Sequence, residues 1–216
     1  MDSMPAHATS AADALGRLRE GNQRFAAGLR SMEVLATHTR RVDLLKGQEP
    51  FAIVLGCSDS RVPAEIVFDQ GLGDLYVIRV AGNIVAPSQV ASVEFAATKF
   101  GTPLVVVLGH SDCGAIAATL EELRQPPAAR RRNLRSIVNR IRPSVEALLA
   151  TELREDPDAL VREAAKANVR ASVDHLRHGS EILEELITGS GLRIVGAEYS
   201  LETGLVEFHD EATEAD

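Results

Sequence analysis

The sequence lacks any hydrophobic run long enough to span a membrane, and no basic segment near its N-terminus leads into an apolar stretch typical of secretion signals. It also lacks internal repeats and a domain-sized linker within its 216 residues. We therefore expect one cytoplasmic domain over residues 1–216, with flexible tails at 1–9 and 210–216. Residues 10–46 are expected to form an N-terminal helical arm, capped by Ser10, that packs either on its own core or on a partner subunit.

An excess of positive charge is also missing, since the formal net charge is −8. This balance argues against a broad nucleic-acid footprint and agrees with a small-molecule partner. Hydrophobic residues make up 45% and charged residues 25%, which is ordinary for a soluble globular protein and excludes disordered and fibrous classes.

Cysteine is scarce, with only Cys57 and Cys113 in the chain. In a reducing compartment, two isolated cysteines serve as metal ligands, nucleophiles or inert core residues more often than as a disulfide. The choice among these roles depends on their neighbours.

Alternating apolar runs and helical patterns predict an α/β fold with a mainly parallel central sheet flanked by helices. A C-terminal antiparallel edge strand is expected to follow the last parallel strand. Strands are expected at 51–55, 75–80, 103–108, 192–199 and 205–208, and helices at 10–28, 40–45, 90–100, 115–123, 133–151 and 158–187. In such sheets ligands bind outside the carboxyl ends of the strands, where Cys57 and His110 emerge.

Two sulfurs and one imidazole, from Cys57, His110 and Cys113, form a donor set that suits zinc. Two residues separate His110 from Cys113, so one loop can supply both, while Cys57 comes from another strand end. Three protein ligands leave the fourth tetrahedral position open, which is typical of a catalytic zinc site.

Asp59 and Arg61 lie two residues apart in the loop that contains Cys57. A guanidinium can hold a carboxylate bidentately, and the held carboxylate can then accept a proton from a nucleophile at the metal. Without Arg61, Asp59 could swing to the metal and fill the fourth position. The alternative is an ordinary salt bridge within the loop.

Other chemistries fit the same residues less well. The segment 109–113 misses the G-x-S-x-G pattern of serine hydrolases because Cys113 stands where the last glycine is required. A Cys113 nucleophile with a histidine base leaves Cys57 unexplained. Gly71 and Gly73 lack the third glycine of a dinucleotide-binding loop, since position 76 is Tyr76.

The two motifs together resemble the signature of the β-class carbonic anhydrases. They are Cys57-Ser58-Asp59-Ser60-Arg61 and His110-Ser111-Asp112-Cys113, and the likeness extends from Glu20-Gly21-Asn22-Gln23-Arg24-Phe25 to the last strand. The resemblance implies one Zn²⁺ per subunit, held by Cys57, His110 and Cys113, and reversible hydration of carbon dioxide to bicarbonate and a proton by zinc-bound hydroxide. It implies catalytic roles for Asp59 and Arg61, with Asp59 as a fourth ligand only in a closed, inactive state.

The resemblance further implies that Gln48, Tyr76 and Phe95 bind substrate, the two aromatic residues as an apolar wall. Phe95 departs from a tyrosine common in similar proteins, so a hydroxyl contact is lost there. His38 is a candidate proton shuttle by its position before the first strand. A homodimer or tetramer is implied, without a nucleic-acid or membrane partner. Two alternatives stay open, namely a carbonyl sulfide or carbon disulfide hydrolase of the same family, and a non-catalytic zinc-binding regulatory protein.

Overall fold

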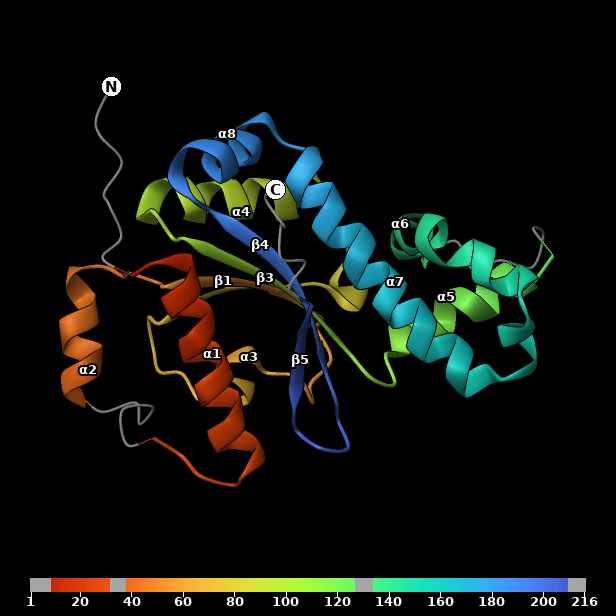
Figure 1. The fold of residues 1–216 in the computed structure, drawn as a ribbon, viewed down its shortest axis with the longest axis horizontal. Coiled ribbons are helices and arrows are strands. Elements are labelled where there is room, and N and C mark those ends of the chain that lie inside the picture. The colour runs from red at the N-terminus through yellow and green to blue at the C-terminus, as the bar shows by residue number, and fades with distance from the viewer. Residues whose placement is uncertain (1–8, 32–37, 127–133, 210–216) are drawn as a thin grey trace, which may run out of the picture.

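A five-stranded sheet in the order β2-β1-β3-β4-β5 forms the centre of the molecule (Figure 1). The computed structural model describes residues 9–31, 38–126 and 134–209. Neighbouring strands from β2 to β4 pair in parallel, and β5 pairs antiparallel with β4, which confirms the predicted α/β class and its antiparallel edge strand. The strands are β1 Ala52–Gly56, β2 Leu75–Arg79, β3 Leu104–His110, β4 Arg193–Tyr199 and β5 Val206–His209.

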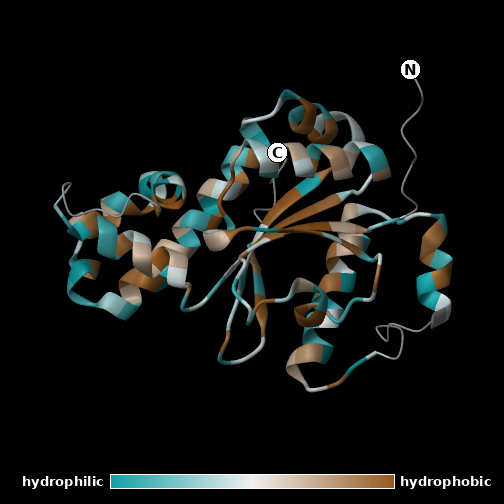
Figure 2. Ribbon diagram, turned by 180° about the vertical axis from the view of Figure 1, so that it is seen from behind, coloured by the Kyte–Doolittle hydropathy of each residue, from teal (hydrophilic) through white to brown (hydrophobic). Residues whose placement is uncertain are grey.

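The central strands β1 and β3 are buried along their whole length, as their continuous apolar sequences predict. Their side chains alternate between two apolar clusters, one on each face of the sheet. Figure 2 shows these strands as hydrophobic, while the surrounding helices carry mixed faces. The core therefore holds the carboxyl ends of β1 and β3 at a defined separation.

Helices cover both faces of the sheet (Figure 1). One face packs against α1 and α3, and the other against α4, α7 and α8. Helix α1 is capped by Ser10, whose side chain accepts the Asp13 N–H, and it packs on its own chain. The helices are α1 Ala11–Ala26, α2 His38–Asp43, α3 Ala64–Val67, α4 Pro87–Phe100, α7 Pro157–His178 and α8 Glu181–Ser190.

A helical lobe extends from the carboxyl edge of the sheet, to one side of the molecule in Figures 1 and 2. It contains α5 Gly114–Arg124, α6 Arg135–Val145, the 3₁₀ segments η6 Glu146–Ala150 and η7 Glu152–Glu155, and the first turns of α7. A third apolar cluster lies under this lobe and includes both cysteines. No helix within the described ranges is both long enough and apolar enough to cross a membrane.

Two helix predictions were wrong in extent. The expected helix over 158–187 is divided, because α7 ends at His178 and Ser180 caps a separate α8 through the Leu183 N–H. The expected helix over 133–151 changes to a 3₁₀ segment after Val145, within three residues of Pro143. Residue 133 and the predicted tails, except Thr9, lie outside the described residues.

Three short elements had no sequence prediction. They are α3, the 3₁₀ turn η3 (Ala81–Asn83) and η7. The turn η3 lies beside the cluster described next.

Candidate metal centre

The sheet register brings the two motif loops together. Gly56, the last residue of β1, lies beside Leu108 of β3, so Cys57 and His110 both emerge at the carboxyl edge. Helix α5 begins directly after the second loop, with Cys113 as its N-cap residue. Asp112 adopts a positive φ of 52°, which turns the chain sharply between β3 and this helix.

Cys57, His110 and Cys113 offer ligand atoms that all lie within 4.8 Å of one another. All three residues are buried, and His110 is fully inaccessible to solvent. Because these side chains come from two loops more than fifty residues apart, their convergence is a product of the fold. The spacing within the group is that of ligands around one small cation.

The protonation and packing of His110 agree with a metal-binding role. Its Nδ1 lies 2.8 Å from the Ser111 carbonyl oxygen, so Nδ1–H donates there and Nε2 carries the lone pair. That Nε2 is buried without a hydrogen-bond partner among the described residues. A buried imidazole nitrogen beside two sulfurs is the donor set that zinc prefers. The residues present therefore fit the ion.

The two cysteines share one negative charge in the metal-free protein. The hydrogen bond from Cys113 is the largest influence on Cys57 and lowers the pKa of its thiol to about 4, although burial opposes this. Contact with Cys57 and burial together raise the pKa of Cys113, so its thiol keeps the proton. Burial lowers the pKa of His110, but contacts with Cys57, Ser111 and Asp59 outweigh it and leave the pKa above its usual value. A divalent cation would displace the remaining protons.

Asp59 and Arg61 form the bidentate pair that the sequence predicts. Arg61 Nε donates to Asp59 Oδ1 at 2.9 Å and Nη2 donates to Oδ2 at 2.8 Å, while the Arg61 backbone N–H also reaches Oδ1. The hydrogen bond from the Arg61 side chain is the largest of the effects that hold the pKa of the Asp59 carboxyl well below its usual range. Asp59 Oδ2 lies 4.0 Å from His110 Nε2. The carboxylate thus faces the cluster while Arg61 engages both of its oxygens.

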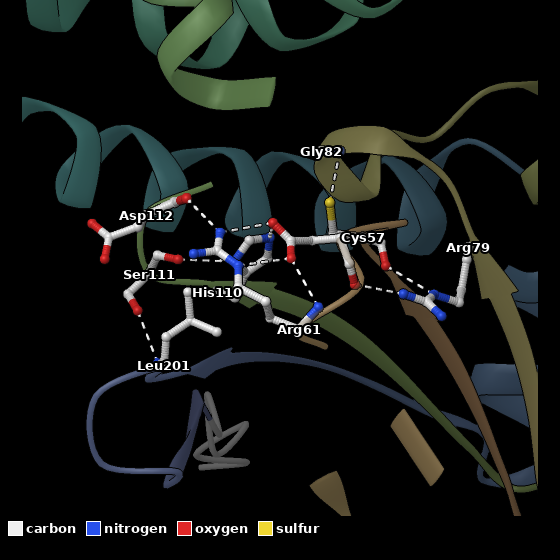
Figure 3. Close-up of polar contacts among 9 residues, drawn as sticks. Cys57, Arg61, Arg79, Gly82, His110, Ser111, Asp112 and Leu201 are labelled. Atoms are coloured by element: carbon white, nitrogen blue, oxygen red, sulfur yellow. Dashed lines mark hydrogen bonds and ion pairs between the residues drawn. The ribbon is translucent and has the colours of Figure 1, made fainter. Parts of the chain in front are cut away.

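Three neighbouring residues contact this group, and the sequence analysis assigned a role to none of them. The Gly82 N–H donates to Cys57 Sγ at 3.3 Å. Arg79 donates to two carbonyls of the Cys57 loop, and the Ser111 carbonyl orients His110 (Figure 3). Ser111 belongs to the second motif, which is a signal in the sequence. Arg79 ends β2 and Gly82 lies in η3 just after it, and neither segment carries a reactive motif.

The three predicted substrate residues are not beside the cluster within this chain. Tyr76 pairs with Ile53, four residues before Cys57, which corresponds to about 13 Å along the strand. Its ring packs with Phe95 and Phe100 at centroid distances of 6.3 and 6.1 Å. Phe95 is 51% exposed and Gln48 is exposed. The side chain of His38 lies outside the described residues, so its proposed role rests on sequence position alone.

Comparison with known proteins identifies relatives over most of the chain. Residues 52–206 match the family model described as carbonic anhydrase. Carbonic anhydrase 2 of Mycobacterium tuberculosis is 40% identical over 195 residues, covering 89% of this chain and 90% of the relative. The carbonic anhydrase of Mycolicibacterium smegmatis is 40% identical over 190 residues, covering 88% and 89% respectively.

Solved structures share the fold. The β-carbonic anhydrase CafA of Aspergillus fumigatus superposes with a TM-score of 0.72 at 27% identity, covering 93% of this chain and 91% of its own. One of two tetrameric β-carbonic anhydrases from Sordaria macrospora superposes with a TM-score of 0.68 at 28% identity, covering 78% and 84%.

Proposed function

Because this chain belongs to the β-class carbonic anhydrase family, we propose that it interconverts carbon dioxide and bicarbonate at the cluster of Cys57, His110 and Cys113. The observation that carries this proposal is the placement of a paired carboxylate beside three converging ligand atoms. Asp59 Oδ2 lies 4.0 Å from His110 Nε2, and Arg61 holds that carboxylate at both oxygens. A purely structural metal site has no need of such a pair.

Cys57 Sγ, His110 Nε2 and Cys113 Sγ would hold one zinc ion per chain. When bound there, zinc supplies a Lewis acid that makes water nucleophilic near neutral pH. The protein's own contribution to this site begins with His110, which the Ser111 carbonyl keeps in the tautomer that presents Nε2. The Gly82 N–H stabilises negative charge on the Cys57 sulfur.

Asp59 would orient the reacting water by accepting a hydrogen bond from it, which directs an oxygen lone pair towards carbon dioxide. The depressed pKa of Asp59 keeps the carboxylate ionised and able to accept that hydrogen bond throughout the neutral range. Arg61 fixes both carboxylate oxygens and also donates to the Asp112 carbonyl at 3.2 Å, which ties the two motif loops together. Arg61 thereby keeps Asp59 from turning towards the metal as a fourth ligand.

Tyr76 and Phe95 would supply an apolar wall for carbon dioxide, and Gln48 a hydrogen bond to a substrate oxygen. Since these three residues lie away from Cys57 in one chain, this part of the proposal requires an assembled dimer or tetramer. The exposed Phe95 ring and the tetrameric state of the Sordaria macrospora relatives support such an assembly.

Stopped-flow hydration of carbon dioxide, followed with a pH indicator on protein of measured zinc content, tests the function. We expect turnover that rises from neutral to alkaline pH. Absence of turnover across that range in fully zinc-loaded protein would exclude carbonic anhydrase activity. Hydrolysis of carbonyl sulfide or carbon disulfide at a higher rate than carbon dioxide hydration would instead favour the sulfur-compound substrates.

A further inference from the structure

Arg79, the last residue of β2, reaches across to the loop that contains Cys57 and Asp59. Its Nε donates to the Cys57 carbonyl at 3.1 Å, and its Nη2 donates to the Asp59 carbonyl at 2.6 Å. One guanidinium therefore donates hydrogen bonds to the backbone on both sides of Ser58. Figure 3 shows Arg79 beside Cys57 with both contacts drawn, on the side of Cys57 away from Ser111.

The parallel pairing of β2 with β1 makes this contact possible. Arg79 lies beside Gly56 in the register, so its side chain starts level with the residue before Cys57. The loop then turns, and the Val62 N–H donates to the same Asp59 carbonyl at 3.1 Å. The backbone of Asp59 is thus fixed by one contact within its own turn and one from the neighbouring strand.

The two functional side chains of this loop depend on that backbone. Cys57 directs its sulfur towards His110 and Cys113, while Asp59, two residues later, directs its carboxylate to a point 4.0 Å from His110 Nε2. Arg61 holds the carboxylate end of Asp59, and Arg79 holds the carbonyl end. Loss of Arg61 would release the carboxylate, whereas loss of Arg79 would remove the contact from the neighbouring strand and leave the Asp59 carbonyl held only by the Val62 N–H.

We propose that Arg79 is a positioning residue, whose guanidinium fixes the backbone of residues 57–59 so that Asp59 stays aligned with the metal centre. The proposal rests on the carbonic anhydrase function above, for which the alignment of Asp59 matters. The hydrogen bonds of the Arg79 guanidinium go to backbone carbonyls, and not to the side chains of the three candidate ligands or to the Asp59 carboxylate. Its planar fork can reach two carbonyls at once, which a lysine ammonium on its flexible stem cannot reproduce in the same geometry.

The test compares Arg79→Gln and Arg79→Lys with the unaltered protein, and with Arg154→Gln as a matched control. Arg154 is an exposed arginine whose recorded ion pair is with its neighbour Glu155, so the control removes an equal charge without touching the loop. The measurements are kcat and KM for carbon dioxide hydration, zinc content, and amide hydrogen exchange in the peptide covering 57–62. The exchange is measured on metal-free protein, which gives a readout independent of turnover.

In Arg79→Gln we expect kcat to fall by about 10–100-fold with unchanged KM and full zinc content, as for other residues that orient a metal site. The Arg61 and Val62 amides, both bonded to Asp59, should exchange faster. Arg79→Lys should recover part of kcat because one hydrogen bond can form. If Arg79→Gln does not fold, the same measurements on Arg79→Lys test the proposal.

Unchanged kcat and unchanged exchange in zinc-loaded Arg79→Gln would overturn the proposal. A fall in kcat that Arg154→Gln matches would do the same, because the effect would then be one of charge. If the unaltered protein hydrates no carbon dioxide, the proposed function fails, and the exchange rates alone decide whether Arg79 holds the loop.

Discussion

Asp59 Oδ2 lies 4.0 Å from His110 Nε2, although the nearest hydrogen-bond donors to Asp59 are those of Arg61. The carboxylate therefore faces the candidate metal centre while Arg61 holds both of its oxygens. This arrangement agrees with the proposal that Cys57, His110 and Cys113 hold the metal and that Asp59 acts on substrate water.

Arg61→Ala is expected to slow carbon dioxide hydration by about 10–100-fold while zinc stays bound, because Asp59 loses its bidentate partner but the three ligands remain. Stopped-flow rates and metal analysis by mass spectrometry check this. Arg154→Ala serves as the control, since Arg154 is 66% exposed and its recorded ion pair is with Glu155. Equal rates in Arg61→Ala and the unaltered protein would remove the pair from the mechanism.

Cys57→Ser is expected to purify with little zinc and little activity, since a serine hydroxyl stays protonated and ligates zinc poorly. Ser58→Ala, at the exposed neighbouring position, should keep both. Metal analysis after dialysis against a weak chelator distinguishes the variants. Full zinc content and full activity in Cys57→Ser would show that the ligand assignment is wrong.

Zinc binding to the metal-free protein is expected to release protons. The lowered pKa of Cys57, about 4, means that this thiol is already ionised near neutral pH, whereas the raised pKa of Cys113 means that it is not. Cys113 thus releases one proton, and His110 adds a fraction because its pKa is also raised. As pH rises, His110 loses its proton before binding, so the share released by the ligands should fall towards one, while ionisation of water at the bound ion would add to the count. Calorimetry in buffers of different ionisation enthalpy measures the total, and release of less than one proton near neutral pH would contradict the assignment of the proton to Cys113.

Asp59→Asn is expected to change the stability of metal-free protein in a pH-dependent way. A carboxyl group whose folded pKa is depressed stabilises the fold above its unfolded value of about 3.9, and this contribution is lost as pH falls through the folded pKa. The Tm difference between the two proteins should therefore be steady at neutral pH and narrow below about pH 4. It should be small and sensitive to salt because Arg61 is half exposed. A difference that grows on acidification would contradict the assigned direction.

Gly109→Ala is expected to destabilise the fold by about 1–3 kcal/mol through overpacking. A Cβ at Gly109 would lie 2.5 Å from Val169 Cγ2, where α7 crosses β3 beside His110. Val169→Ala in the same chain should recover part of the loss, since it removes the clash. Urea unfolding measures each variant. Gly189→Ala, where a Cβ has no neighbour within 4 Å, is the control, and an equal loss there would exclude the packing explanation.

The strand predictions succeeded where the pattern was local and strong. The apolar sequences of β1 and β3 are buried throughout, and the turns that follow them contain the motif residues. The sequence analysis missed the division between α7 and α8 because the helical pattern continues on both sides of Gly179 and Ser180, where one helix ends and the next begins. The Ser180 hydroxyl donates to Glu94 at 2.6 Å, a contact with α4 that periodicity cannot reveal.

The ligand set and the Asp59–Arg61 pair were readable from residue types and short spacings, because each motif is contained in one loop that follows one strand. Contacts between distant segments were not readable in this way. Only the packed structure brings the Gly82 N–H to Cys57 Sγ, with Asn168 of α7 holding the Gly82 carbonyl, and only the pairing of β2 with β1 brings Arg79 to the loop. These hydrogen bonds join residues at least twenty positions apart, and their geometry follows from sheet register and helix packing rather than from local sequence.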